Sequence, residues 1–244
     1  MMTQNIYDDA GFFQNYSQLP RSQRGLDGAP EWPALRALLP PLTGASVLDL
    51  GCGFGWFCRF VAGEGAAEVV GVDVSERMLA RARAETSATS LRYEQADLET
   101  YEPAAGQFDL VYSSLAFHYL VDLAAVFGRV ARALKPSGRF VFSVEHPIMT
   151  APRHQTWGED ASGLPVWPVG AYLDEGRRVT DWLADGVVKQ HRTLASYLNL
   201  LIRLGFRLRH VEEWGPTSEQ IAAEPDWAKE RERPAFLLIA AEKP

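Results

Sequence analysis

Short apolar, β-prone runs alternate with segments of helical character along the first 146 residues of this chain. Turn residues bound each run, and the segments between them place apolar side chains on one helical face. Regular alternation of this kind predicts a parallel sheet with helices on both of its faces. The β-prone runs span residues 46–50, 68–73, 90–95, 108–112 and 139–144.

Polar groups stand at the end of each of these five runs. Because ligands of open α/β sheets bind outside the carboxyl ends of the strands, this succession indicates a ligand-binding edge. A single polar residue at a strand end is ordinary turn chemistry, but five in a row favour a site. The groups are Asp49 with its glycines, Asp73, Asp97, Ser113-Ser114 and Glu145-His146.

Glycines at alternate positions follow the first run and its acidic residue Asp49. These are Gly51, Gly53 and Gly55. Glycine lets the backbone turn sharply and approach a ligand closely. About twenty residues later Asp73 ends the second run, where nucleoside-binding folds place a carboxylate that accepts hydrogen bonds from ribose hydroxyls. A dinucleotide site would need a GxGxxG pattern, but Trp56 stands where its third glycine would be, which disfavours that ligand.

The segment over residues 147–190 departs from the alternating pattern. Its β-prone runs at 169–173, 177–183 and 187–191 predict a small antiparallel meander reached by a long loop. Its aromatic residues would suit a lid over a flat or apolar substrate, and a dimerisation or packing sheet is the alternative. They are Trp157, Trp167, Tyr172 and Trp182.

The chain closes with a predicted helix over 193–204 and two β-prone runs, 207–214 and 235–241. Only a short, turn-rich stretch separates these runs. This spacing is compatible with antiparallel pairing of the last two strands and with a brief helix between them.

Composition narrows the class of protein. A hydrophobic content of 47% supports a sizeable core, and the formal net charge of −7 argues against a surface that tracks nucleic-acid phosphates. The chain has no apolar run near ~20 residues and no signal pattern, so we expect a cytoplasmic protein without a membrane partner. Cys52 and Cys58 show no metal-ligand spacing and are expected to be reduced packing residues, with no metal site.

Together these motifs resemble the class I S-adenosylmethionine-dependent methyltransferases over about residues 44–146. The matching features are the acidic residue with its GxGxG turn, the second acid Asp73, and Asp97 with its hydrophobic follower Leu98. The turn over 134–139 is similar to the family's Leu-Lys-Pro-Gly-Gly. Ser137 replaces a glycine there, which we expect to be harmless because Gly138 remains.

The resemblance implies a Rossmann-like α/β fold. It has a seven-stranded, mostly parallel sheet with helices on both faces and an antiparallel last strand, here with a small β-rich insertion. We expect a single methyltransferase domain over 1–244. Its parts are an N-terminal arm and helix (1–45), a cofactor-binding core (46–146), a lid or substrate insertion (147–190) and a C-terminal helix and strands (191–244).

The family's cofactor, S-adenosylmethionine, assigns roles to matched positions. The glycine turn would lie against the methionine end, with Asp49 orienting it or reaching the amino group. Asp73 would bind the ribose, Asp97 the adenine amino group and the Leu98 backbone the ring edge. The remaining assigned contacts come from Gly51, Gly53 and Gly55 in the turn, Ser113 under the methionine portion, and Val74 and Met78 as an apolar wall.

Two residues before the first strand are further candidates. Segments in this position often fold over the cofactor in related enzymes, so Tyr16 and Arg21 would bond or ion-pair with its carboxylate. The alternative is an arm packed on the surface. For Met78 the alternative is an ordinary core position on its helix.

Methyl transfer requires alignment of nucleophile and methyl, exclusion of water and, for some acceptors, removal of a proton. The candidates for a base or substrate contact are His118, His146 and His191, each with a structural or capping role as the alternative. Ser113-Ser114-Leu115-Ala116 stands where base and amide methyltransferases carry an Asn/Asp-Pro-Pro-aromatic motif. We therefore expect O- or N-methylation of a small molecule by a monomer or homodimer. A non-catalytic relative that acts as a partner or regulatory module is the alternative.

Overall fold

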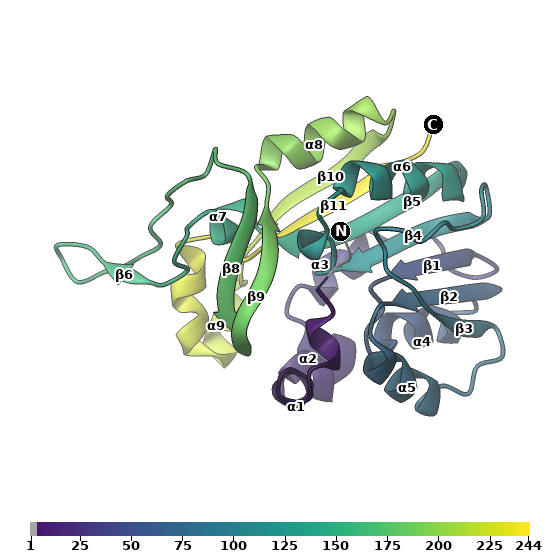
Figure 1. Cartoon of the computed structure of the whole chain (residues 1–244), viewed down its shortest axis with the longest axis horizontal. Coiled ribbons are helices and arrows are strands. Elements are labelled where there is room, and N and C mark those ends of the chain that lie inside the picture. The colour runs from purple at the N-terminus through teal and green to yellow at the C-terminus, as the bar shows by residue number, and fades with distance from the viewer. Residues whose placement is uncertain (1–3) are drawn as a thin grey trace.

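The computed structural model describes residues 4–244 and contains a seven-stranded sheet in the order β10-β11-β5-β4-β1-β2-β3. Strands β1 to β5 pair in parallel, and β11 pairs antiparallel with both β5 and β10. The predicted fold class is confirmed, including the antiparallel last strand (Figure 1). The strands are β1 (Ser46–Leu50), β2 (Glu68–Asp73), β3 (Leu91–Gln95), β4 (Phe108–Ser114), β5 (Leu134–Glu145), β10 (Arg207–Trp214) and β11 (Phe236–Glu242).

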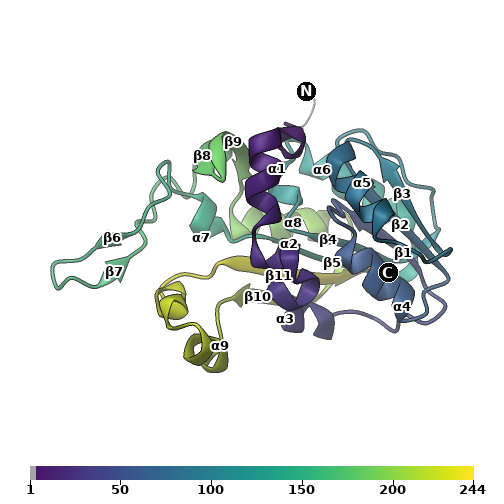
Figure 2. The ribbon, with the colours of Figure 1, turned by 90° about the horizontal axis from the view of Figure 1, so that it is seen from below.

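Two apolar clusters cover the two faces of this sheet, because alternate residues of the buried strands point to opposite sides. Leu48 of β1 belongs to the cluster under α6 and α8, whereas Val47 belongs to the cluster under α3 and α4. Figure 2 shows these helices from below the sheet of Figure 1. The helices are α3 (Trp32–Ala37), α4 (Trp56–Gly63), α5 (Glu76–Ala84), α6 (Leu123–Ala133) and α8 (Leu194–Arg203).

Several of these helices begin at a side chain that accepts a backbone hydrogen bond. Ser75 accepts from the amide of Met78 and so begins α5 directly after the second strand. Asp122 and Thr193 cap α6 and α8 in the same way. The caps fix where each helix leaves the edge of the sheet.

The remaining elements precede, interrupt or follow this core. A short helical turn over Ile6–Asp8, α1 (Ala10–Ser17), α2 (Pro20–Gln23) and a turn over Gly25–Gly28 form the N-terminal arm. The others are a turn over Phe117–Tyr119, α7 (Pro147–Thr150), β6 (Gly158–Glu159), β7 (Pro165–Val166), β8 (Gly176–Trp182), β9 (Ala184–His191), α9 (Ser218–Ala223) and a turn over Pro225–Arg231. No helix within residues 4–244 is long and apolar enough to cross a membrane.

The predicted three-run meander of the insertion is wrong. The structure has two separate hairpins, β6–β7 and β8–β9, and residues 169–173 form no strand. Gly170 and Ala171, the latter with φ of 55°, turn the chain there, and Leu173 is 84% exposed with no strand beside it. The hairpin β6–β7 extends away from the rest of the molecule (Figure 1).

The turn over residues 134–138, which lies within the first part of β5, also differs from expectation. The left-handed backbone conformation lies at Ser137, with φ of 62°, and Gly138 is not among the positive-φ residues. Gly138 is needed for space, because a Cβ there would lie 2.9 Å from the carbonyl oxygen of Lys135. The serine, not Gly138, therefore stands at the position that favours glycine, which contradicts the reason for expecting the serine to be harmless.

Candidate functional site

A cavity of about 330 Å³ opens at the carboxyl edge of the sheet. Its walls come from the strand ends, the N-terminal arm and the hairpin β8–β9, so segments distant in sequence meet around it. Many predicted residues line it. These are Tyr16, Arg21, Gly51, Gly53, Asp73, Val74, Met78, Asp97, Leu98 and His118.

The glycine turn brings backbone directly to the cavity. Gly51 has φ of 81°, and a Cβ there would lie 2.4 Å from the Cβ of Ala116. Gly53 has φ of 52°, and a Cβ there would meet no atom within 4 Å. The turn is thus packed against Ala116 at Gly51, whereas the space beside Gly53 is open. Gly55, with φ of 71°, precedes α4 and lies outside the cavity lining.

Two predicted acids lie at the cavity. The carboxylate of Asp73 accepts backbone hydrogen bonds from Gly53 at 2.8 Å and Ser75 at 2.9 Å, and burial raises its pKa. Asp97 accepts from the amide of Glu99 at 2.9 Å. These bonds fix both carboxylates at neighbouring strand ends.

Asp49 lies behind the glycine turn instead of in the main cavity. It borders a smaller cavity of about 100 Å³, which shares Tyr16, Arg21 and the glycines with the larger one. Its side chain accepts from Sγ of Cys58 at 3.2 Å. Burial raises its pKa to about 7, so a cation placed nearby would be needed to keep it fully ionised. Both cysteines are free and buried, as expected.

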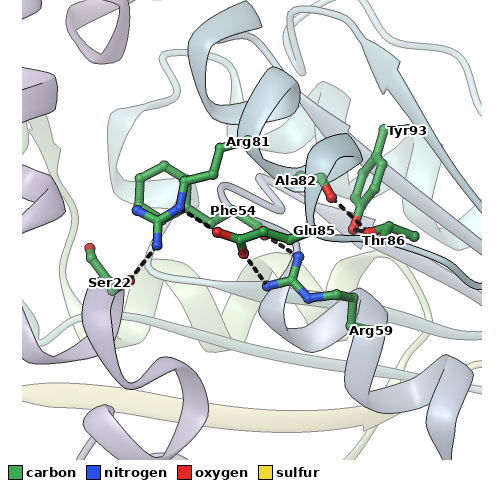
Figure 3. A network of polar contacts seen from close by, with 8 residues as sticks. All are labelled: Ser22, Phe54, Arg59, Arg81, Ala82, Glu85, Thr86 and Tyr93. Atoms are coloured by element: carbon green, nitrogen blue, oxygen red, sulfur yellow. Dashed lines mark hydrogen bonds and ion pairs between the residues drawn. The ribbon is translucent and has the colours of Figure 1, made fainter.

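A polar network holds the glycine turn against α5 and the arm. The guanidinium of Arg81 lies 4.0 Å from the ring centroid of Phe54 and donates to Glu85 at 2.8 Å. Arg59 donates to the carbonyl oxygen of Phe54 at 2.6 Å, and Arg81 also donates to the carbonyl oxygen of Ser22. Figure 3 shows these contacts converging on Phe54 and Glu85. The network fixes the turn that faces the cavity.

The N-terminal arm folds over the cavity. Asp8 accepts from Oγ of Ser75 at 2.6 Å, which attaches the arm to the start of α5. Tyr16 and Arg21 line the cavity, and Arg21 pairs with Glu31 at 3.1 Å. The alternative of an arm merely packed on the outer surface does not fit this placement.

Ser113 does not face the cavity. Its hydroxyl donates to the carbonyl oxygen of Leu50 at 2.7 Å, and its side chain is fully buried. Ser114 lines the cavity instead. Strand β4 runs two residues further than predicted, and alternate side chains of a strand point to opposite sides.

Of the three histidines, one reaches the cavity. His118 is buried there, its Nδ1 accepts from the amide of Glu145 at 3.3 Å, and burial lowers its pKa to about 4. The neutral ring therefore carries its proton on Nε2. It can donate to a ligand but is not poised to accept a proton at that nitrogen.

The other two histidines lie outside the cavity lining, and both of their ring nitrogens are engaged. His146 accepts from the amide of Ile148 at 3.1 Å and contacts Glu213 at 2.9 Å. His191 bonds with Oγ1 of Thr150 at 2.8 Å and the carbonyl oxygen of Tyr172 at 2.9 Å. These contacts match the structural and capping alternative.

Glu145 lines the cavity although the sequence assigned it no role. Its Oε1 accepts from Nζ of Lys189 at 2.6 Å, and Lys189, on β9, is only 1% exposed. Burial alone would raise the pKa of Glu145, but Lys189 and His118 together hold it below its usual value. The position of Glu145 at a strand end was the one sequence signal for a place at the cavity. Its partner Lys189 lies 44 residues away in the sequence and could not be identified from local spacing.

The hairpin β8–β9 joins the arm above the cavity. Trp182 lines the cavity and packs against the rings of Phe12 and Tyr16 at centroid distances of 5.7 and 6.3 Å. Gln4 accepts from the amide of Val188 at 2.9 Å. Arm and hairpin therefore form a common cover. Aromatic residues missed by the sequence analysis complete the walls, namely Tyr7, Tyr119 and Phe236.

Comparison with known proteins places these features in context. Residues 47–138 match the family described as "Methyltransferase domain". A crystal structure of an S-adenosylmethionine-dependent methyltransferase from Mesorhizobium loti is 56% identical, covers 89% of this chain and all of that one, and has a TM-score of 0.87.

Two curated relatives match over shorter spans. A malonyl-[acyl-carrier protein] O-methyltransferase from Enterobacter lignolyticus is 36% identical over 61% of this chain and 55% of its own length. A ubiquinone biosynthesis O-methyltransferase from Thiobacillus denitrificans is 41% identical over 42% of this chain and 45% of its own length.

Proposed function

The chain belongs to the class I S-adenosylmethionine-dependent methyltransferases, and we propose that it methylates an oxygen or nitrogen of a small molecule by in-line displacement. The observation that carries this proposal is the open cavity, which extends from the glycine turn to His118 and Glu145. A non-catalytic relative would need no such space beside its cofactor site. The O-methyltransferases among its relatives support the same reaction class.

The residues around the cavity fit S-adenosylmethionine. Asp73 keeps lone pairs for the ribose hydroxyls after accepting its backbone bonds, and Asp97 lines the same cavity from the neighbouring strand end, where it would face the adenine amino group. Val74 and Met78 supply an apolar wall, and Leu98 lines the same cavity. When bound, the cofactor supplies an electrophilic methyl group on a sulfonium, so the protein needs no metal or nucleophile of its own.

The methionine end fits the region between the two cavities. Gly51 and Gly53 leave room for it, and Arg21 and Tyr16 face it from the arm. Asp49 borders the smaller cavity, where an ammonium group would favour its ionised form. In this placement Arg21 of the arm would face the carboxylate of the cofactor's methionine group. Asp49, at the other side of the glycine turn, would face its ammonium group.

The acceptor side is formed by His118, Glu145 and the aromatic cover. Arm and hairpin close over this end and limit it to a small molecule. Burial of the site excludes water and holds the acceptor near the methyl group. Positioning the two reactants in this way is what accelerates methyl transfer.

Calorimetry with S-adenosylhomocysteine tests the cofactor site. We expect the wild type to bind and Gly53→Ala to lose at least 10-fold in affinity, because the new Cβ projects into the cavity. Gly44→Ala is the matched control, since Gly44 has φ of 76° and also has open space, but lies outside the cavity lining. Equal affinity of both variants would contradict the proposed site.

Turnover separates an enzyme from a binding module. Methyl-labelled S-adenosylmethionine is incubated with protein and a fractionated small-molecule extract, and labelled product is measured. Transfer that depends on the protein and is lost in Gly53→Ala supports the proposal. Cofactor binding without transfer to any fraction would favour the non-catalytic alternative.

A further inference from the structure

We infer that the methyl acceptor presents a neutral hydroxyl group, which donates to Oε2 of Glu145 and passes its proton to that oxygen during transfer. This inference rests on the proposed function and names the acceptor class of the same cavity. It assigns Glu145 as a catalytic residue, with Lys189 and His118 as the residues that position it.

The first observation is an incomplete hydrogen-bond set on Glu145. Oε1 is bonded to Lys189, but Oε2 is buried and has no hydrogen-bond partner within residues 4–244. A buried carboxylate oxygen without a donor is costly, and such oxygens in folded proteins are normally satisfied. Because Glu145 lines the cavity, a ligand there can supply the missing donor.

The second observation is the charge balance around this carboxylate. Lys189, 1% exposed, already neutralises Glu145, and Arg233 adds a weaker positive influence from outside the cavity lining. An ammonium acceptor would add a positive charge beside the cofactor's sulfonium, with no uncompensated anion to receive it. The pairing therefore disfavours a cationic acceptor.

An anionic acceptor is disfavoured for the opposite reason. Among the described residues that line the cavity, Arg21 is the only lysine or arginine, and it is paired with Glu31 near the methionine end. A carboxylate acceptor would be repelled by Glu145, and no unpaired lysine or arginine among the described lining residues would offset this repulsion. A neutral hydroxyl satisfies Oε2 without either penalty.

The walls indicate the body that carries this hydroxyl. Tyr7, Tyr119, Trp182 and Phe236 surround the space with aromatic rings, and Leu120 and Met149 add apolar surface. Such walls stabilise a flat or apolar body by burial and ring stacking. The inferred class is thus an aromatic or apolar alcohol or phenol.

The step balances in atoms and electrons. A lone pair of the hydroxyl oxygen forms the new bond to the methyl carbon, and the carbon–sulfur bond breaks with its electron pair going to sulfur. The hydroxyl proton passes to Oε2 of Glu145 and leaves to water after the products depart. Although Lys189 weakens this carboxylate as a base, an alkylated hydroxyl is far more acidic than a carboxylic acid, so transfer runs downhill.

The test uses matched sets of probes on phenyl, naphthyl, indolyl and alkyl bodies, each offered as hydroxyl, aminomethyl and carboxylate. Release of S-adenosylhomocysteine is measured, and the site is first shown by calorimetry to bind that product. We expect hydroxyl probes to have kcat/KM values at least 10-fold above their amine and carboxylate partners. Preference for either partner, or rejection of every hydroxyl probe by protein that binds the cofactor product, overturns the inference.

Variants test the assignment of Glu145. Glu145→Gln should lower kcat about 100-fold with an unchanged KM for the cofactor, and Glu145→Asp should restore part of the rate. Because Glu145→Gln leaves Lys189 buried without its anion, the double variant Glu145→Gln/Lys189→Met keeps the test valid if the single variant misfolds. Wild-type kcat in either folded variant overturns the inference. Loss of cofactor binding by the wild type itself would instead contradict the proposed function.

Discussion

At the scale of single residues, the buried carboxylate of Asp49 lowers the stability of the fold when it is ionised, although the ionised form is the one that would bind the cofactor's ammonium group. It is 2% exposed, and burial raises its pKa to about 7. Between pH ~4 and ~7 the folded protein therefore retains a proton that the unfolded chain has released. The free energy of unfolding falls as pH rises through this window, and the loss is complete above the folded pKa.

Asp49→Asn removes this titration. At pH 8 we expect a free energy of unfolding about 2 kcal/mol above that of the wild type without cofactor, with the gain shrinking toward pH 4. Affinity for S-adenosylhomocysteine should fall, because the ammonium group loses its anion. Urea unfolding at several pH values and calorimetry measure the two effects. A variant less stable than wild type at pH 8 would contradict the argument.

Asp109→Asn is the control of opposite sign. Although burial opposes it, the bond to Lys135 at 2.7 Å lowers the pKa of Asp109. A lowered pKa gives stability that is present above the unfolded value and lost as pH falls through the folded one. This variant should therefore gain nothing at pH 8.

How far single residues could be predicted depends on whether local spacing places them. Asp73 and Asp97 reach the cavity as expected because each stands at the end of its own strand. Ser113 and Ser114 differ by one residue, and only the true end of β4 decides which of them faces the cavity. Glu145 acquires its environment from Lys189 on a distant strand, which no local pattern encodes.

At the scale of elements, the turn over residues 134–138 in the first part of β5 concentrates backbone strain in one serine. Ser137 has φ of 62°, a region that costs an L-residue roughly 1–2 kcal/mol. Ser137→Gly should raise the free energy of unfolding by about 0.5–1 kcal/mol, since the glycine's extra chain entropy offsets part of the gain. Denaturant melts of the two proteins measure this difference.

The neighbouring glycine gives the contrasting variant. Gly138→Ala should destabilise the fold, because its Cβ would lie 2.9 Å from the carbonyl oxygen of Lys135. If Ser137→Gly proved destabilising instead, the strain assigned to this turn would be absent.

Elements were predictable where hydrophobic period and caps agree, as at α5 with its Ser75 cap. They were not where composition alone suggested a strand. Residues 169–173 look β-prone, but no partner strand lies beside them, so their backbone groups gain nothing from an extended ladder. Whether residues 169–173 form a strand depends on a pairing partner, and the local sequence does not contain that information.

At the scale of the whole molecule, the cover of the cavity is built from two segments far apart in the sequence, the N-terminal arm and the hairpin β8–β9. Gln4 and Asn15 of the arm bond to backbone groups of the hairpin β8–β9, and Phe12 packs against Trp182. Both parts touch the cavity, so a ligand that fills it contacts both of them. Binding should therefore stabilise both together.

Hydrogen exchange with and without S-adenosylhomocysteine measures this coupling. We expect backbone amides of residues 6–23 and of β8–β9 to exchange at least 10-fold more slowly in the bound protein, because opening must then break ligand contacts as well. The hairpin β6–β7 is the internal control, because it extends away from the rest of the molecule (Figure 2) and does not line the cavity, so it should exchange at the same rate in both states. Protection of the arm alone would show that the hairpin β8–β9 is not part of the cover. The hairpin would then have a purely structural role and would not act as a lid.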